Sequence, residues 1–194
     1  YISATNEACP LFNSYYMRPL TSMLMDGCLE NAMLIDDGGT EYWSKSINSC
    51  GLANAANSLV AIEQIVFKEH ILTMEQFNEV LRNNFDGNEA LRQELLHKLP
   101  KYGNGDSIAD DHARFVVETF CNSVNGKRTF NGNMYRAGLY SFYATVRHWG
   151  SVTPATPDGR KAGELLALNA TPAHGTVKNG LTASLKSVNA YDHA

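Results

Sequence analysis

The sequence predicts an α/β fold, because stretches with helical periodicity alternate with a stretch typical of a buried strand. Between Ala53 and Pro100, apolar residues recur three or four positions apart, which is the spacing of one helix face. Leu139–Gly150 is rich in aromatic and β-branched residues, which favour strands. With 194 residues, 44% of them hydrophobic, the chain can bury a core, and its uniform composition indicates one domain or part of a larger one.

The middle of the chain predicts three helices in succession. Residues 53–70 form the first, because their apolar side chains share one face. The second should begin at Thr73, which has the capping-box spacing with Gln76, and end at Gly87. Residues 88–100 repeat the apolar pattern and stop at a proline, so the last two helices should form a hairpin.

A glycine-rich turn precedes the next predicted helix, which Asp106 or Ser107 should cap. The acidic first turn of this helix suits the positive end of a helix dipole. Leu139–Gly150 is then expected to be a buried strand. From Ser151 onward we expect mostly loop, with TASLKSV, residues 182–188, as a further strand.

Charge and composition limit the function. The formal net charge is −4 and the cations are scattered, so the sequence offers no basic surface for nucleic acid or anionic lipid. No apolar run approaches the ~20 residues that cross a bilayer, and no signal peptide is evident, so a cytoplasmic protein is expected. The four cysteines lie far apart without metal-ligand spacing, which predicts reduced thiols and no metal site.

Residues 153–163, TPATPDGRKAG, combine two prolines, a Pro-Asp-Gly turn and paired cations. This stretch belongs to a series of blocks that also includes DGCLENAMLIDDGGTEYW, GLANAANSLVAIEQIVFKE and LPKYGNGDSIADDHA. The series ends with TPDGRKAGELLALNATPAHGTVKNGLTASLKSV. In this order the blocks resemble the later part of the glycyl radical enzymes related to pyruvate formate-lyase, and the match runs from about Arg18 to Val188.

The resemblance implies a ten-stranded α/β barrel made of two antiparallel half-barrels. Residues 1–194 would be one part of that barrel, the partial pyruvate formate-lyase-like domain that precedes the glycyl radical loop. In the family, one loop inside the barrel carries a catalytic cysteine and another carries a glycine with a stable radical. A closed, dry cavity protects such radicals from side reactions. Residues 153–163 resemble the family's fixed turn between the last strands, close to the radical loop.

Cys28 and Glu30 look like the Cys-x-Glu catalytic motif of the radical dehydratases. The surrounding residues match instead the family's later segment, in which a double glycine and a tyrosine follow the cysteine. The family's Arg-Val-x-Gly-Tyr motif, which carries the radical glycine, is absent. We therefore expect both catalytic loops to lie outside this segment, no catalytic residue and no radical glycine within it, and no activity from the segment alone.

Five residues are candidates for the substrate pocket or the loops around it. Tyr42 matches the family's tyrosine after the double glycine, which lines the pocket in dehydratase-like members, and a phenol can hydrogen-bond a substrate hydroxyl or carboxylate. Packing is the alternative role for Tyr42. Gly38 and Gly39 would let this loop approach the cavity closely. Arg160 and His174 are further candidates for loop contacts, although a structural role is also expected for both.

GLANAANSLVAI follows directly after the GGTEYW loop, and a compact helical hairpin comes next. This arrangement looks more like the dehydratase and decarboxylase branch of the family than like formate acetyltransferase. The first hypothesis is therefore an anaerobic lyase that cleaves a C–C or C–heteroatom bond of a small organic substrate by radical chemistry. Formate C-acetyltransferase, which uses coenzyme A, is an alternative, and a non-catalytic relative that binds a partner chain is another. The resemblance also implies a radical S-adenosylmethionine activating enzyme as partner, contacts with the remaining parts of the same enzyme, and a homodimer.

Overall fold

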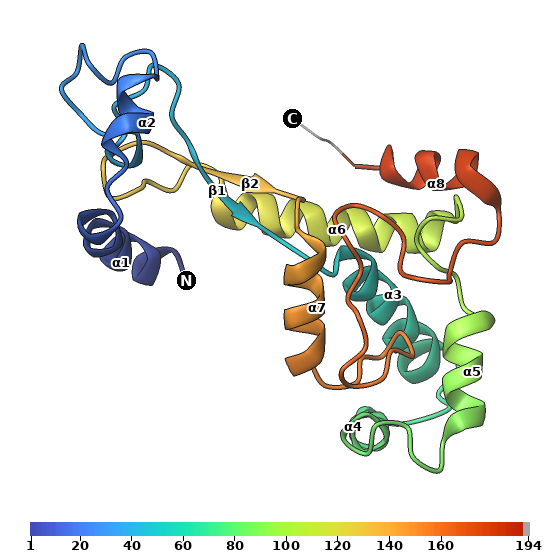
Figure 1. Cartoon of the computed structure of the whole chain (residues 1–194). Coiled ribbons are helices and arrows are strands. Elements are labelled where there is room, and N and C mark those ends of the chain that lie inside the picture. Colours follow the sequence, from blue (N-terminus) through green and yellow to red (C-terminus); the bar gives the residue numbers. More distant parts are fainter. Residues whose placement is uncertain (192–194) are drawn as a thin grey trace. The chain divides into compact units, whose positions relative to one another are not determined.

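The structure is a computed structural model that describes residues 1–191. The chain divides into two compact units (Figure 1). The first unit comprises Tyr1–Ile47 and Phe120–Gly138, and the second comprises Asn48–Thr119 and the described chain from Leu139 onward. Within residues 1–191, no helix is both long and apolar enough to span a bilayer.

The first unit holds short elements joined by long loops. They are α1 (Ile2–Tyr15), α2 (Pro19–Met23), the 3-10 turn η1 (Ile35–Asp37), β1 (Lys45–Asn48) and β2 (Tyr135–Gly138). β1 pairs with β2 in a two-stranded sheet. The expected barrel is not seen within residues 1–191, because a barrel closes through continuous strand pairing and this sheet holds two strands. The described part is a mixed α/β fragment.

The second unit is mainly helical. Its elements are α3 (Leu52–Ile62), the π-helix η2 (Glu63–Lys68), α4 (Met74–Arg82), α5 (Glu89–His97), α6 (Ser107–Val124), α7 (Tyr143–Val152) and α8 (Gly180–Val188). The last residues of α6 belong to the first unit. α3 with η2, α4 and α5 confirm the three helices predicted between residues 53 and 100.

The core of the second unit lies among α3, η2, α4 and α5. Its buried members are Ala61, Ile65, Val66, Phe77, Val80, Phe85, Leu95 and Ala155. All of them except Ala155 lie in the stretches predicted to be helices, and burying one large side chain stabilises the fold by roughly 1.5–3 kcal/mol. Ala155 joins this core from the loop after α7, so the loop is fastened to the helices by packing.

The predicted helix starts are confirmed by the hydrogen bonds of their caps. Thr73 Oγ1 accepts from the backbone N–H of Gln76 at 3.2 Å, and Gln76 Oε1 accepts from the N–H of Thr73 at 2.9 Å. At the start of α6, Asp106 Oδ1 accepts from the N–H of Ile108 at 3.0 Å. Each bond satisfies a backbone donor that has no partner inside the helix.

The two predicted strands in the later part of the chain are wrong. Leu139–Gly150 was expected to be a strand, but α7 occupies most of this stretch and buries Val146 and Gly150, four residues apart on one helix face. Residues 182–188 were also expected to be a strand, but they lie in α8. In both places, contacts with distant segments override the local strand propensity of the residues.

Candidate functional site

Arg160 holds the turn formed by residues 153–164. Its side chain is buried, with 5% exposed, and its guanidinium donates to backbone carbonyls on both sides of the turn. Nη1 donates to the carbonyl of Glu164 at 2.7 Å, and Nη2 donates to those of Thr153, at 3.1 Å, and Pro154. Burial lowers the pKa of Arg160, but a guanidinium stays charged in proteins. This is the structural role that the sequence left open for Arg160.

Asp158, at the tip of the same turn, is bound by α3. Nδ2 of Asn54 donates to Asp158 Oδ2 at 2.7 Å, while Asn54 Oδ1 accepts from the N–H of Ala167 at 2.7 Å. One amide side chain thus joins a helix to two points of the loop. Sequence reasoning missed Asn54, although two asparagines three residues apart, Asn54 and Asn57, on a largely apolar helix were a usable signal.

Lys101 also binds this turn. Its side chain is buried, and Nζ donates to the backbone carbonyl of Asp158 at 3.0 Å. Burial lowers the pKa of Lys101 to about 8, and the Asp158 carboxylate opposes that shift. A buried ammonium is costly because it loses its hydration, so burial favours the neutral amine of Lys101.

The block containing Lys101 also positions the segment around His174. Asn104 Nδ2 donates to the carbonyl of Thr176 at 2.9 Å, and Asn104 Oδ1 accepts from the N–H of Lys178 at 2.7 Å. Gly103 has φ +96° and packs so closely on Pro172 that a Cβ there would lie 2.1 Å from the proline Cγ. The block LPKYGNGDSIADDHA thus contacts the last block at two places, the carbonyl of Asp158 through Lys101 and residues 172–178 through Gly103 and Asn104.

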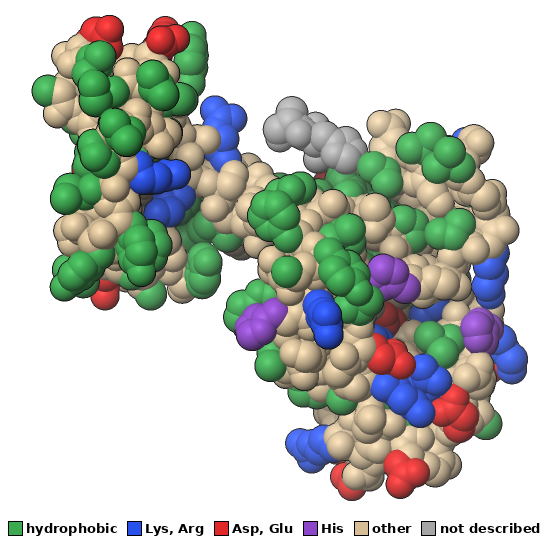
Figure 2. Space-filling model, viewed as in Figure 1, with side chains coloured by type: hydrophobic (Ala, Val, Ile, Leu, Met, Phe, Trp, Pro, Cys, Tyr) green, Lys and Arg blue, Asp and Glu red, His purple; other side chains and the backbone are tan. Residues whose placement is uncertain are grey.

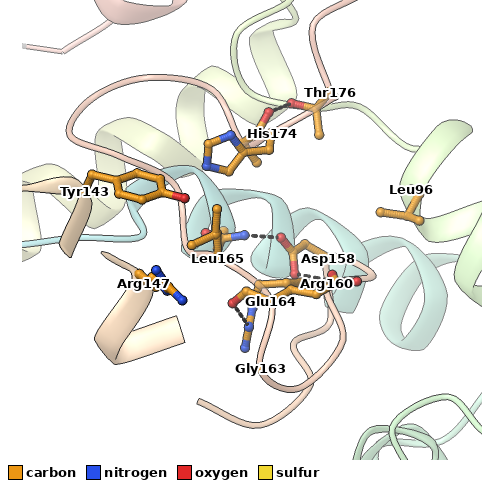
Figure 3. Close-up of a pocket in the computed structure, with 12 residues that line it drawn as sticks. Leu96, Tyr143, Arg147, Asp158, Arg160, Gly163, Glu164, Leu165, His174 and Thr176 are labelled. Carbon is orange, nitrogen blue, oxygen red and sulfur yellow. Dashed lines mark hydrogen bonds between the residues drawn. The ribbon is translucent and has the colours of Figure 1, made fainter. Parts of the chain in front are cut away.

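An open cavity of about 680 Å³ lies between α7 and these two loops (Figure 3). Its lining includes Tyr143 and Arg147 from α7, Arg160 and Glu164 from the first loop, and His174 from the second. The structure thus brings Arg160 and His174 to one site. No hydrogen bond or ion pair within residues 1–191 engages the exposed guanidinium of Arg147, so its donors are available to an acidic or hydroxylated group.

Gly38, Gly39 and Tyr42 lie in the first unit. Gly38 has φ +97°, and a Cβ on Gly39 would lie 2.3 Å from the carbonyl oxygen of Met33, so both glycines are required by the tight loop. The carbonyl of Gly39 accepts from Asn31 Nδ2 at 2.9 Å. Tyr42 is 88% exposed, so its ring is not packed against other residues of the described part of the chain.

Residues 1–191 offer no group of three or more His, Cys, Asp or Glu side chains that could hold a metal ion. Cys28, the rejected catalytic candidate, is buried in the first unit with 3% exposed. The cysteines are free thiols, as expected.

Known proteins are similar in sequence to most of this chain. Residues 1–148 match the family described as pyruvate formate lyase-like. The chain is 39% identical to a protein named probable dehydratase YbiW from Escherichia coli K12, over 87% of this chain and 22% of that protein. It is 31% identical to trans-4-hydroxy-L-proline dehydratase from Clostridioides difficile, over 90% of this chain and 22% of that enzyme.

Solved structures agree with this relationship. The glycerol-bound B12-independent glycerol dehydratase from Clostridium butyricum superposes with a TM-score of 0.83 at 35% identity, over 91% of this chain and 22% of that one. A chain from Roseburia inulinivorans, described under 1,2-propanediol dehydration, gives a TM-score of 0.89 at 32% identity, over 99% and 25%. The chain spans about a fifth of the length of the curated relatives it matches. It belongs to the pyruvate formate lyase-like family of glycyl radical enzymes, within the branch of dehydratases and decarboxylases.

Proposed function

We propose that residues 1–194 are the segment preceding the radical glycine loop of a glycyl radical lyase. The full-length protein would cleave a C–O, C–C or C–S bond of a small organic substrate. The observation that carries this proposal is the similarity, over nearly the whole chain, to dehydratases, a sulfite-lyase and an indoleacetate decarboxylase. The glycyl radical would initiate hydrogen abstraction from the substrate, and it would be carried by a residue outside this segment.

The surface of the first unit supports the view that this segment works inside a larger enzyme. Figure 2 shows hydrophobic side chains spread over that unit. Those exposed by 60% or more include Leu11, Phe12, Tyr15, Tyr16 and Met17. Apolar surface of this extent is usually covered by other protein. We propose that the remaining parts of the same enzyme cover it, and that the segment alone is inactive.

Tyr42 is the proposed substrate contact. Its phenol is exposed on a loop whose shape depends on Gly38 and Gly39, so the side chain is available to a group outside the described residues. Relatives have been solved with glycerol and with trans-4-hydroxy-L-proline bound, and both ligands carry hydroxyl groups that a phenol can hydrogen-bond. Cys28 has no catalytic role in this proposal.

The proposal extends to the partners expected from the family. An activating enzyme that uses S-adenosylmethionine would install the radical, and the full-length protein would form a homodimer. Family membership is what supports these two partners.

The experiment is anaerobic activation of the full-length protein with its activating enzyme, followed by a substrate panel. The panel contains vicinal diols, hydroxyproline, amino alcohols, isethionate and arylacetates, with pyruvate plus coenzyme A as the competing reaction. We expect an elimination or decarboxylation product from one class. Dominant formation of acetyl-CoA would reject the lyase assignment. A failure to form any glycyl radical doublet in electron paramagnetic resonance would favour a non-catalytic relative.

A further inference from the structure

Cys9 and Lys45 face each other inside the first unit. Cys9 lies in α1 and is buried, while Lys45 is the first residue of β1. The ammonium Nζ of Lys45 donates to Sγ of Cys9 at 2.5 Å. This is closer than the ~3.5 Å at which non-bonded heavy atoms usually settle, and it is close enough for a single atom to bridge the nitrogen and the sulfur.

The direction of Lys45 follows from its place in the strand. Along β1, Lys45 and Ile47 lie on the more covered face, while Ser46 and Asn48 are exposed. The ammonium also lies over the ring of Phe130, 5.9 Å from its centroid, which is within the range of a cation–π interaction. The strand and the aromatic ring together hold the amine against the sulfur.

The cysteine is held equally firmly from the side of α1. Asn6, one helical turn before Cys9, accepts a hydrogen bond from the hydroxyl of Tyr135 at 2.8 Å. Its Nδ2 donates to the carbonyl of Arg128 at 2.9 Å. Tyr135 is itself buried. Because α1 is fastened to the β2 region on both sides of this amide, the thiol has little freedom to turn away from Lys45.

A route for a small apolar oxidant reaches the thiol. A groove of about 320 Å³ runs along α1, lined by Tyr1, Ala4, Thr5, Ala8, Cys9 and Phe12. Its walls are almost entirely apolar, which favours dioxygen over a charged or strongly hydrated oxidant. Figure 2 shows the hydrophobic character of this unit's surface.

We propose that Cys9 and Lys45 form a covalent sulfur–oxygen–nitrogen bridge when the protein meets dioxygen. The Lys45 ammonium first gives one proton to solvent. The S–H bond of Cys9 and one N–H bond of the resulting amine then break, while one S–O and one O–N bond form. One oxygen atom of dioxygen enters the bridge, and the other leaves as water with the two hydrogens. The thiol–amine pair is oxidised and dioxygen is reduced, so no further reagent is needed. The bridge ties α1 to β1. It does not depend on the proposed lyase activity.

The test uses the full-length protein, purified without oxygen and then held in air-saturated buffer. Proteolysis and tandem mass spectrometry should give a linked pair of peptides containing Cys9 and Lys45, heavier than the two free peptides by one oxygen less two hydrogens. Alkylation of Cys9 should be lost after exposure to air and restored by dithiothreitol. Sulfinic acid would not be restored in this way, so the reduction step separates the two products.

Two variants and an internal control test whether the linked peptide requires both Cys9 and Lys45. Lys45→Arg keeps a cation over Phe130 but removes the primary amine, and Cys9→Ser removes the sulfur, so the linked peptide should disappear in both. Cys28 is also buried in this unit, and no hydrogen bond joins it to a lysine within residues 1–191, so it should remain an alkylatable thiol under the same exposure. Oxidation of Cys9 with Lys45 unmodified would overturn the proposal, and so would the absence of any linked peptide.

Discussion

Asn54 on α3 donates a hydrogen bond of 2.7 Å to the carboxylate of Asp158, and both side chains are buried. The two residues are far apart in sequence, and their contact fixes the turn after α7 on the helical core. Through its other amide atom, Asn54 also accepts from Ala167. One side chain of a distant helix therefore fastens the loop that lines the cavity at two points, Asp158 and Ala167.

Replacing Asn54 should loosen this loop. In Asn54→Ala, an Asp158 oxygen and the N–H of Ala167 lose their partner in a buried place, which costs roughly 1–3 kcal/mol. Hydrogen–deuterium exchange of residues 153–169 in the full-length protein should become about tenfold to a hundredfold faster. Asn78→Ala, an exposed change on α4, is the matched control and should leave exchange unchanged. Equal protection in both variants would show that the hydrogen bonds of Asn54 do not hold the loop.

Arg160→Lys should also loosen the turn, although it conserves the charge. A lysine ammonium lacks the planar fork that reaches the carbonyls of Thr153 and Glu164 together. The expected result is faster exchange within residues 153–164, by about tenfold for each ~1.4 kcal/mol lost. Arg136→Lys on the exposed side of β2 provides the control. Wild-type protection in Arg160→Lys would mean that the charge matters and the geometry does not.

Lys101 predicts a pH dependence of stability. Its pKa is lowered to about 8 in the folded chain, from 10.5 in the unfolded one, so between these values the unfolded chain binds more protons. The penalty for burying the ammonium is complete below pH 8 and disappears as pH rises towards 10.5. At about 1.4 kcal/mol for each pKa unit, the free energy of unfolding should increase by about 3 kcal/mol across this range.

The comparison between wild type and Lys101→Met isolates this contribution from that of other groups. The melting temperature of the wild-type full-length protein, relative to that of the variant, should rise as the pH is raised from 8 to about 10. Above about pH 10, the ionisation of tyrosines would change the melting temperatures of both proteins alike. A constant or falling difference in melting temperature would contradict the buried, protonatable state of Lys101.

Tyr42→Phe tests the proposed substrate contact. If the hydroxyl binds a substrate oxygen, its removal should cost roughly 1–3 kcal/mol, and kcat/KM of the full-length enzyme should fall about tenfold to a hundredfold. The melting temperature and the yield of glycyl radical should remain unchanged, because the ring is retained. Tyr15→Phe, at another exposed tyrosine of the first unit, should have wild-type kinetics. Unchanged kinetics in Tyr42→Phe would remove this residue from the proposed site.

The helices between residues 53 and 100 could be predicted because their signals are local. The capping box of Thr73 and Gln76 joins atoms three residues apart, and the apolar stripes repeat within single helices. The turn of residues 153–163 was also recognisable, and so was the structural role left open for Arg160. Family membership followed from the order of several sequence blocks, which no single element reveals.

The tertiary structure decided the features that depend on distant contacts. α7 has the composition of a strand, but it is a helix, and Gly150 on it lies so near the loop that a Cβ would be 2.5 Å from the carbonyl oxygen of Glu164. α8 is held by Ser184, which donates to the carbonyl of Gly103 at 2.8 Å. The partners of Asn54, Lys101 and Cys9 were equally invisible in the sequence. The physical reason is that periodicity and capping act over a few residues, whereas burial and hydrogen bonding between remote segments depend on how the whole unit packs.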